Sequence, residues 1–76
     1  MLTKKRALEK LRWKIGRLHS HYNFTRRYAV NEEITKLKFS YIVAAKELVQ
    51  YANLVGVISL EQWSKMMHKI SDWSKK

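Results

Sequence analysis

The side chains of this sequence that could do chemistry are mainly cationic, and most of them lie in its first third. Residues 1–30 contain nine Lys and Arg and one acidic residue, a net charge of +8, whereas residues 31–76 contain seven and five. All five arginines lie between Arg6 and Arg27. Guanidinium and ammonium groups form charge-assisted hydrogen bonds with phosphates and carboxylates. This strongly basic segment therefore favours an anionic partner, as does the formal charge of +10 for the whole chain.

A tryptophan lies among these cations. If residues 3–20 are helical, Trp13 points away from the apolar stripe of that helix. A solvent-facing indole among cations indicates a contact surface, where the ring could stack on a base or anchor a protein interface. Alternatively, another part of the chain covers the ring, and the cations form an ordinary solvated face. The candidate residues for binding nucleic acid or an acidic partner are Lys5, Arg6, Lys10, Arg12, Trp13, Lys14, Arg17, Arg26 and Arg27.

The residues expected of an enzyme or a metal site are not arranged for either role. His19 and His21 would fall on opposite sides of a helix, and no carboxylate is placed to complete a metal-binding set. No Ser or Thr nucleophile can be paired with a base, and there is no glycine-rich phosphate loop. The six acidic residues lie mostly at expected helix starts or on solvent faces, which does not favour acid–base catalysis. We therefore expect a non-enzymatic protein without a metal or other cofactor.

Helices must position these side chains. The sequence has no proline, two glycines and 46% hydrophobic residues at helical spacing, which predicts an all-α fold. We expect one compact three-helix bundle spanning 1–76, with helices at about 3–20, 32–55 and 60–73. The chain has no cysteine, so no disulfide can stabilise this small core.

The first predicted helix carries an apolar stripe between two groups of basic residues. The stripe comprises Leu8, Leu11, Ile15, Leu18 and Tyr22. A band on one side of it comprises Arg6, Lys10, Lys14 and Arg17, and the other side carries Lys5 and Arg12. If the stripe packs inward, a cationic surface faces solvent. Arginines on separate sides of the fold, or arginines paired with the chain's own carboxylates, would contradict this interpretation.

Residues 20–30 break the helical period and are expected to form a connector. Ser20 and Asn23 favour turns, and the connector would present Arg26 and Arg27. If it folds back beside the first helix, it extends the basic surface. Equally, it could be a solubilising loop with Tyr28 packed into the core.

Capping residues mark the other helix ends. Thr3 and Asn31 are expected N-caps, Gly56 is expected to take the left-handed conformation that ends the second helix, and Ser59 with Gln62 forms a capping box. The expected inward positions of the second helix are Ile34, Leu37, Tyr41, Ala45, Leu48, Ala52 and Val55. Those of the third are Leu60, Trp63, Met67 and Ile70, flanked by Met66 and Trp73.

Phe39 and Val43 are apolar residues outside the inward stripe of the second helix. A helix that is apolar nearly all round is normally buried on both sides. We expect the 20–30 segment to cover these two residues in part. The alternative is that they form a protein interface, including one between two copies of this chain.

The segment Gly56-Val57-Ile58-Ser59-Leu60-Glu61-Gln62-Trp63 resembles the helix corners of many short helical proteins of bacteriophages and mobile elements. This resemblance implies phage-type roles, such as small DNA-binding accessory factors and inhibitors of host nucleic-acid machinery, including anti-CRISPR proteins. It assigns no functional residue.

Two functions follow as hypotheses. The first is a non-enzymatic domain that binds nucleic acid through phosphates with low sequence specificity. The alternative is a small protein-binding regulator or inhibitor, for example of host nucleic-acid-processing machinery such as CRISPR effectors. A helix-turn-helix is not favoured, because the helix at 60–73 contains no arginine. Membrane binding is not favoured either, because the first helix needs its apolar stripe to complete the core. We expect a cytoplasmic protein, or a nuclear one in a eukaryotic host.

Overall fold

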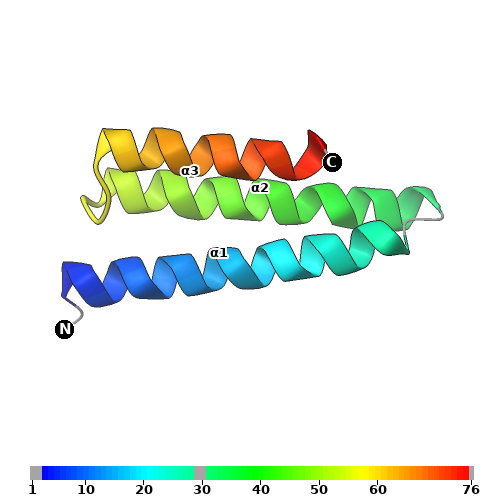
Figure 1. The fold of residues 1–76 in the computed structure, drawn as a ribbon, viewed down its shortest axis with the longest axis horizontal. Helices are drawn as coiled ribbons and strands as arrows, with labels where there is room; N and C mark the ends of the chain where they lie inside the picture. The colour runs from blue at the N-terminus through cyan, green and yellow to red at the C-terminus, as the bar shows by residue number, and fades with distance from the viewer. Residues whose placement is uncertain (1–2, 29–30, 76) are drawn as a thin grey trace.

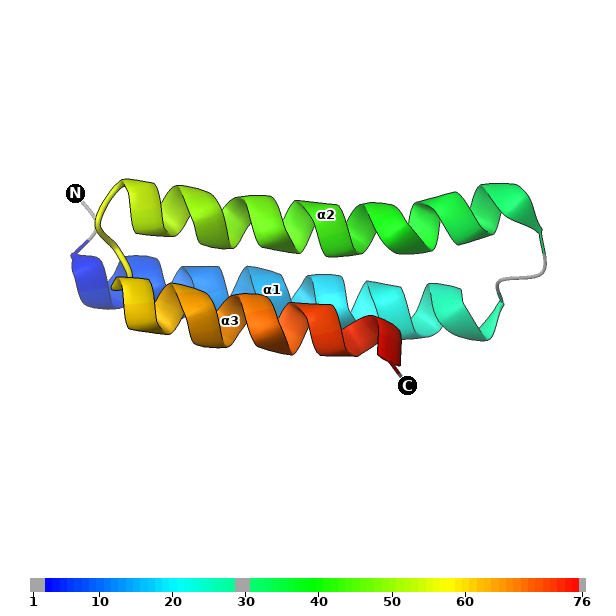
Figure 2. The ribbon, with the colours of Figure 1, turned by 90° about the horizontal axis from the view of Figure 1, so that it is seen from above.

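Three α-helices and a terminal 3-10 turn make up the computed structural model of the chain, which describes residues 3–28 and 31–75 (Figure 1). They are α1 (Lys4–Arg27), α2 (Glu32–Leu54), α3 (Leu60–Asp72) and η1 (Trp73–Lys75). α2 runs antiparallel to α1, and α3 runs antiparallel to α2 (Figure 1). Figure 2 shows that α1 and α3 lie on the same side of α2. The predicted all-α three-helix bundle is confirmed.

The helix starts form as the local sequence predicts. The side chains of Thr3 and Asn31 accept hydrogen bonds from the backbone N–H groups three residues later, at 3.2 and 2.9 Å. Ser59 and Gln62 form the predicted capping box: Ser59 Oγ accepts from the Gln62 N–H at 3.2 Å, and the Ser59 N–H donates to Gln62 Oε1 at 2.9 Å. These bonds satisfy N–H groups that the first helical turn leaves without a partner, so they fix where each helix begins.

The corner between α2 and α3 is closed by Gly56, whose φ is +82°. The Gly56 N–H donates to the Asn53 carbonyl at 3.1 Å, and the Val57 N–H donates to the Ala52 carbonyl at 2.9 Å. This pair of bonds is the Schellman arrangement, which requires a left-handed residue at the position of Gly56. The predicted left-handed glycine is confirmed.

α1 is longer than predicted, because it continues through residues 20–27 without a break. The expectation of a connector is therefore wrong for residues 20–27, and residues 29–30 of that segment lie outside the described residues. Tyr22 and Thr25 are both buried. Tyr22 follows Leu18 by four residues and Thr25 follows Tyr22 by three, so the inward stripe continues past Ser20. The helix of 24 residues is about 36 Å long. Arg26 and Arg27 therefore lie in its last turn, where their positive charges interact favourably with the negative end of the helix dipole.

The core lies between α2 and the two helices that pack on it. Its buried residues are Leu11, Tyr22, Ile42, Ala45, Val49, Ala52, Ile58, Ile70 and Trp73. In α2 the expected stripe is partly wrong: Leu37 and Val55 are about half exposed, whereas Ile42 and Val49 are buried. The reason is that α2 packs against both α1 and α3. Its buried face is therefore wider than a stripe that contacts a single helix, and it is centred on different residues. The prediction that Leu60 faces inward is also wrong. It begins α3 at the end of the bundle, and it is 70% exposed.

α3 is much shorter than the two helices beside it. It ends at Trp73, whose ring stacks on that of His19 with centroids 4.6 Å apart. The centroid of the Trp73 ring also lies 6.0 Å from that of Tyr22. Beyond this point α1 and α2 continue as a two-helix hairpin (Figure 1). Across residues 3–28 and 31–75, no helix combines the length and the apolar character needed to cross a bilayer.

Candidate nucleic-acid interface

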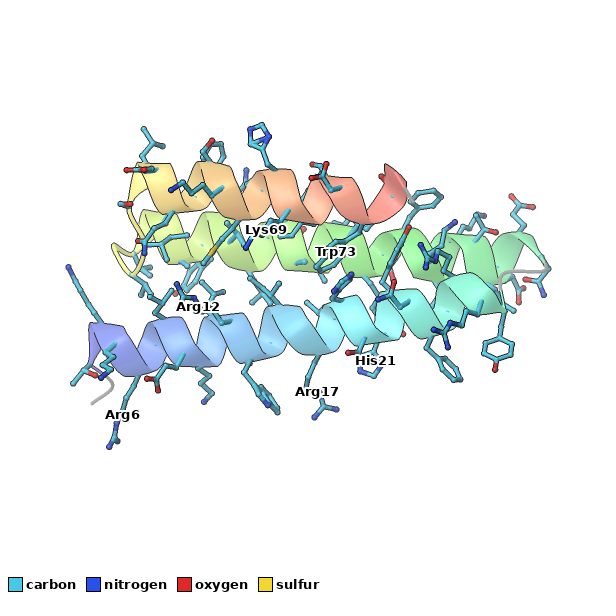
Figure 3. All side chains as sticks on the ribbon, in the orientation of Figure 1. Arg6, Arg12, Arg17, His21, Lys69 and Trp73 are labelled. Atoms are coloured by element: carbon cyan, nitrogen blue, oxygen red, sulfur yellow. The ribbon has the colours of Figure 1, made fainter. Side chains whose placement is uncertain are left out.

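The cations of α1 lie on two sides of the helix. In Figure 3, Arg6 and Arg17 project away from α3, whereas Arg12 points into the space between α1 and α3, where Lys69 and Trp73 also lie. This agrees with the two sides on which helical periodicity placed the cations, and it means that the predicted binding residues do not form one continuous surface. The reason is the helical geometry of α1, because its inward stripe separates the two groups and packing on α2 and α3 gives each group a different neighbour.

The first group forms a row along α1, which we call the cationic row: Arg6, Lys10, Lys14 and Arg17. All four side chains are exposed, and they follow one another at steps of one helical turn over about 16 Å. Two salt bridges, Lys36–Glu32 at 3.6 Å and Lys65–Glu61 at 3.3 Å, lie within α2 and α3 and do not involve the row. Within that part of the chain the row is not neutralised by the protein's own carboxylates.

A groove between α1 and α2, the α1/α2 groove, has a volume of about 640 Å³. Its lining residues are Trp13, Lys14, Arg17, Leu18, His21, Ala44, Glu47, Leu48 and Tyr51. Trp13 is 58% exposed, in line with the expectation that it faces solvent, and Tyr51 is 65% exposed. The guanidinium carbon of Arg17 lies 5.0 Å from the centroid of the Trp13 ring, a cation–π contact that orients both groups. The structure therefore brings together Trp13, Lys14 and Arg17 from the predicted set.

The second group of cations lines a groove between α1 and α3, the α1/α3 groove, with a volume of about 800 Å³. Its charged lining residues are Arg12, Arg26, Arg27, Lys65, Lys69 and Asp72, and its apolar floor includes Ile15, Met66, Ile70 and Trp73. Sequence reasoning missed Lys65 and Lys69. Their spacing of four residues places them on one face of α3, but only the packing of α3 beside α1 shows that this face adjoins Arg12.

Tyr51 is the other functional candidate that sequence reasoning missed. It follows Leu48 by three residues, so it lies at the edge of the face of α2 that packs on α1. This spacing could have identified Tyr51, but the predicted inward face of α2 was rotated from the observed one. Lys5 is exposed on the first turns of α1 and lines neither groove.

Phe39 and Val43 are not covered by the segment that was expected to cover them. They are 48% and 54% exposed on α2, because residues 20–27 are helical and pack on a different face. The ammonium of Lys38 lies 4.9 Å from the Phe39 ring centroid. These two residues remain candidates for a protein interface.

The histidines of α1 pack against different helices. His19 stacks on Trp73 and lies 3.3 Å from the side-chain amide of Asn23, whereas His21 stacks on Tyr41 of α2 with ring centroids 5.6 Å apart. In the part of the chain that the structure describes, no group of three or more His, Asp or Glu residues could hold a metal ion.

The arrangement as a whole can bind anions along α1 and offer aromatic rings beside them. Comparisons with models of protein families, with curated proteins and with solved structures find no match, so functional inference for this chain starts from its own residues.

Proposed function

We propose that this chain is a non-enzymatic domain that binds nucleic acid with low sequence specificity through the cationic row. The supporting observation is that Arg6, Lys10, Lys14 and Arg17 are exposed and have no carboxylate partner among the described residues. A polyphosphate backbone neutralises such a row by releasing its condensed counterions, which is the main source of affinity in non-specific binding. Under this proposal the protein acts in the cytoplasm, or in the nucleus of a eukaryotic host.

Binding through the cationic row should have low sequence specificity. Contacts to phosphates position a protein on nucleic acid without reading its sequence. Because Arg12, Arg26 and Arg27 lie on the other side of α1, a ligand on the row does not reach them along the same face. They are assigned here as a secondary contact, and the cationic row is the primary one.

The test is the salt dependence of binding to a labelled oligonucleotide, measured by fluorescence anisotropy. If the row contacts four phosphates, the slope of log K against log salt concentration is about −3 to −4. The triple variant Lys10→Gln, Lys14→Gln and Arg17→Gln should flatten the slope by about 2 to 3 and weaken binding at every salt concentration.

The matched control removes the same amount of charge from α2. It carries Lys36→Gln, Lys38→Gln and Lys46→Gln, and it should lower affinity much less, because only the general field of the protein falls. Equal losses in the two triple variants, or binding by the wild type that does not change with salt, would refute the proposal.

A second candidate function is a protein-binding regulator or inhibitor, of the kind found in phages and mobile elements. The exposed Phe39 and Val43 favour it, because half-exposed apolar side chains on a helix are suited to anchor a partner. The discriminating experiment is co-purification from native lysate with and without nuclease. A defined complex that survives nuclease and is lost in Phe39→Ala would support this candidate over the first one.

A further inference from the structure

Two exposed aromatic rings line the same groove from different helices. Trp13 comes from α1 and Tyr51 from α2, and both line the α1/α2 groove, whose floor includes Leu18 and Leu48. The other aromatic residues of this region pair with rings of the protein, as His21 does with Tyr41. Among the described residues, neither Trp13 nor Tyr51 contacts another aromatic ring. Tyr51 is therefore available to a ligand, and Trp13 is available on the face that Arg17 does not cover.

The charges around this groove favour a phosphate-bearing ligand. Lys14 and Arg17 line it, Lys10 and Arg6 continue the cationic row along α1, and Glu47 is the one carboxylate among the lining residues that the structure describes. The Arg17 guanidinium lies over the Trp13 ring, which places a cation directly beside the indole.

A groove with cations along one wall and aromatic rings beside them has the composition that binds unpaired nucleic acid, in which phosphates follow the charges and bases stack on the rings. The geometry points to single-stranded nucleic acid as the ligand of the α1/α2 groove, with an unpaired base on Trp13, a second contact at Tyr51, and phosphates on Lys14 and Arg17. This assignment rests on the proposed function and names its substrate class.

A duplex fits these residues less well. Its base faces are covered by neighbouring base pairs, so it could use the cationic row but would leave Trp13 and Tyr51 without a stacking partner. A second copy of this chain also fits poorly. A symmetric dimer through this groove would bring Lys14 and Arg17 against the same cationic face of a partner that carries its own charge of +10.

The test compares one mixed-sequence oligonucleotide of about 12 nucleotides with the same strand annealed to its complement, using the full chain and fluorescence anisotropy. The single strand should bind at least about five-fold more tightly, which is the lower end of what one stacked base contributes. Trp13→Ala and Tyr51→Ala should each weaken binding of the single strand by about five-fold to 150-fold and leave binding of the duplex nearly unchanged.

Controls separate stacking from charge and from folding. Phe24→Ala removes an exposed ring of α1 that lines neither groove, and it should have no effect on either ligand. Trp13→Phe should restore part of the affinity lost in Trp13→Ala, because a smaller ring can still stack. Far-UV circular dichroism should be unchanged in all variants, since the replaced rings are exposed.

The outcomes are distinguishable. If single strand and duplex bind equally and Trp13→Ala has no effect, the assignment to unpaired strands is overturned while phosphate binding by the row stands. Equal competition by polyglutamate of the same total charge would also overturn it, because an acidic polypeptide offers no bases to stack. If neither nucleic acid binds, the proposed function itself is overturned.

Discussion

The two glycines of this chain should respond oppositely to the same substitution. Gly16 lies inside α1, and a Cβ built there meets no atom within 4 Å other than those of its chain neighbours and of the backbone of its own helix. Gly56 also has open space around it, but its φ of +82° is one that residues with a side chain adopt only at a cost. The structure thus separates the effect of backbone conformation from any effect of steric contact.

The magnitudes follow from this difference. Gly16→Ala should raise the free energy of unfolding by about 1 kcal/mol, because alanine loses less backbone entropy in a helix. In a domain of this size that corresponds to an increase in Tm of roughly 4–8 °C. Gly56→Ala should lower the free energy of unfolding by about 1–2 kcal/mol, through strain in the left-handed conformation.

The assay is urea unfolding followed by far-UV circular dichroism, with the midpoint and the m-value fitted for each variant. Both variants should keep the m-value of the wild type, because neither change alters the surface exposed on unfolding. Destabilisation by Gly16→Ala would refute the continuous, uncovered path of α1 through this residue. A neutral Gly56→Ala would refute the left-handed corner between α2 and α3.

Three further predictions concern stability. Ser59→Ala should lower the free energy of unfolding by about 1 kcal/mol, because it removes the acceptor of the capping box; Gln62→Ala tests the reciprocal bond in the same urea assay. Ile70→Val should cost about 0.5–1.5 kcal/mol, since the side chain is almost fully buried, and a smaller cost in thermal unfolding would mean that the α3 core is loosely packed. Phe39→Ser combined with Val43→Ser should change stability by less than about 0.5 kcal/mol in dilute solution, because both side chains are exposed. A larger loss that grows with protein concentration would instead show that these residues are covered by a second copy of the chain.

Local signals predicted the starts of all three helices and the end of α2, whereas the end of α1 and the buried face of α2 depend on packing. The cap at Asn31, the capping box of Ser59 and Gln62, and the left-handed Gly56 depend on residues within one turn, so their sequence pattern is sufficient. The end of α1 was predicted too early, because the turn preference of Ser20 and Asn23 is weaker than the burial of Tyr22 and Thr25.

In the candidate site, too, some features follow from local sequence and others depend on how the helices pack. The exposure of Trp13 and the two-sided placement of the cations on α1 follow from helical periodicity within one segment. Tyr51, Lys65 and Lys69 enter the grooves only because α2 and α3 pack beside α1 in a particular rotation. A single sequence does not specify that rotation, because apolar residues surround much of α2 and several faces could have packed inward.

The regular spacing of the cationic row also affects the helix that carries it. Arg6 with Lys10, Lys10 with Lys14, and Lys14 with Arg17 are like charges one turn apart, and their mutual repulsion destabilises α1 by about 1 kcal/mol in total at low ionic strength. Added salt screens this repulsion, so it strengthens the fold under the same conditions in which it weakens attachment to phosphates. A bound polyanion relieves the repulsion directly. Its presence should therefore raise the melting temperature most in dilute buffer, where the free protein is least stable.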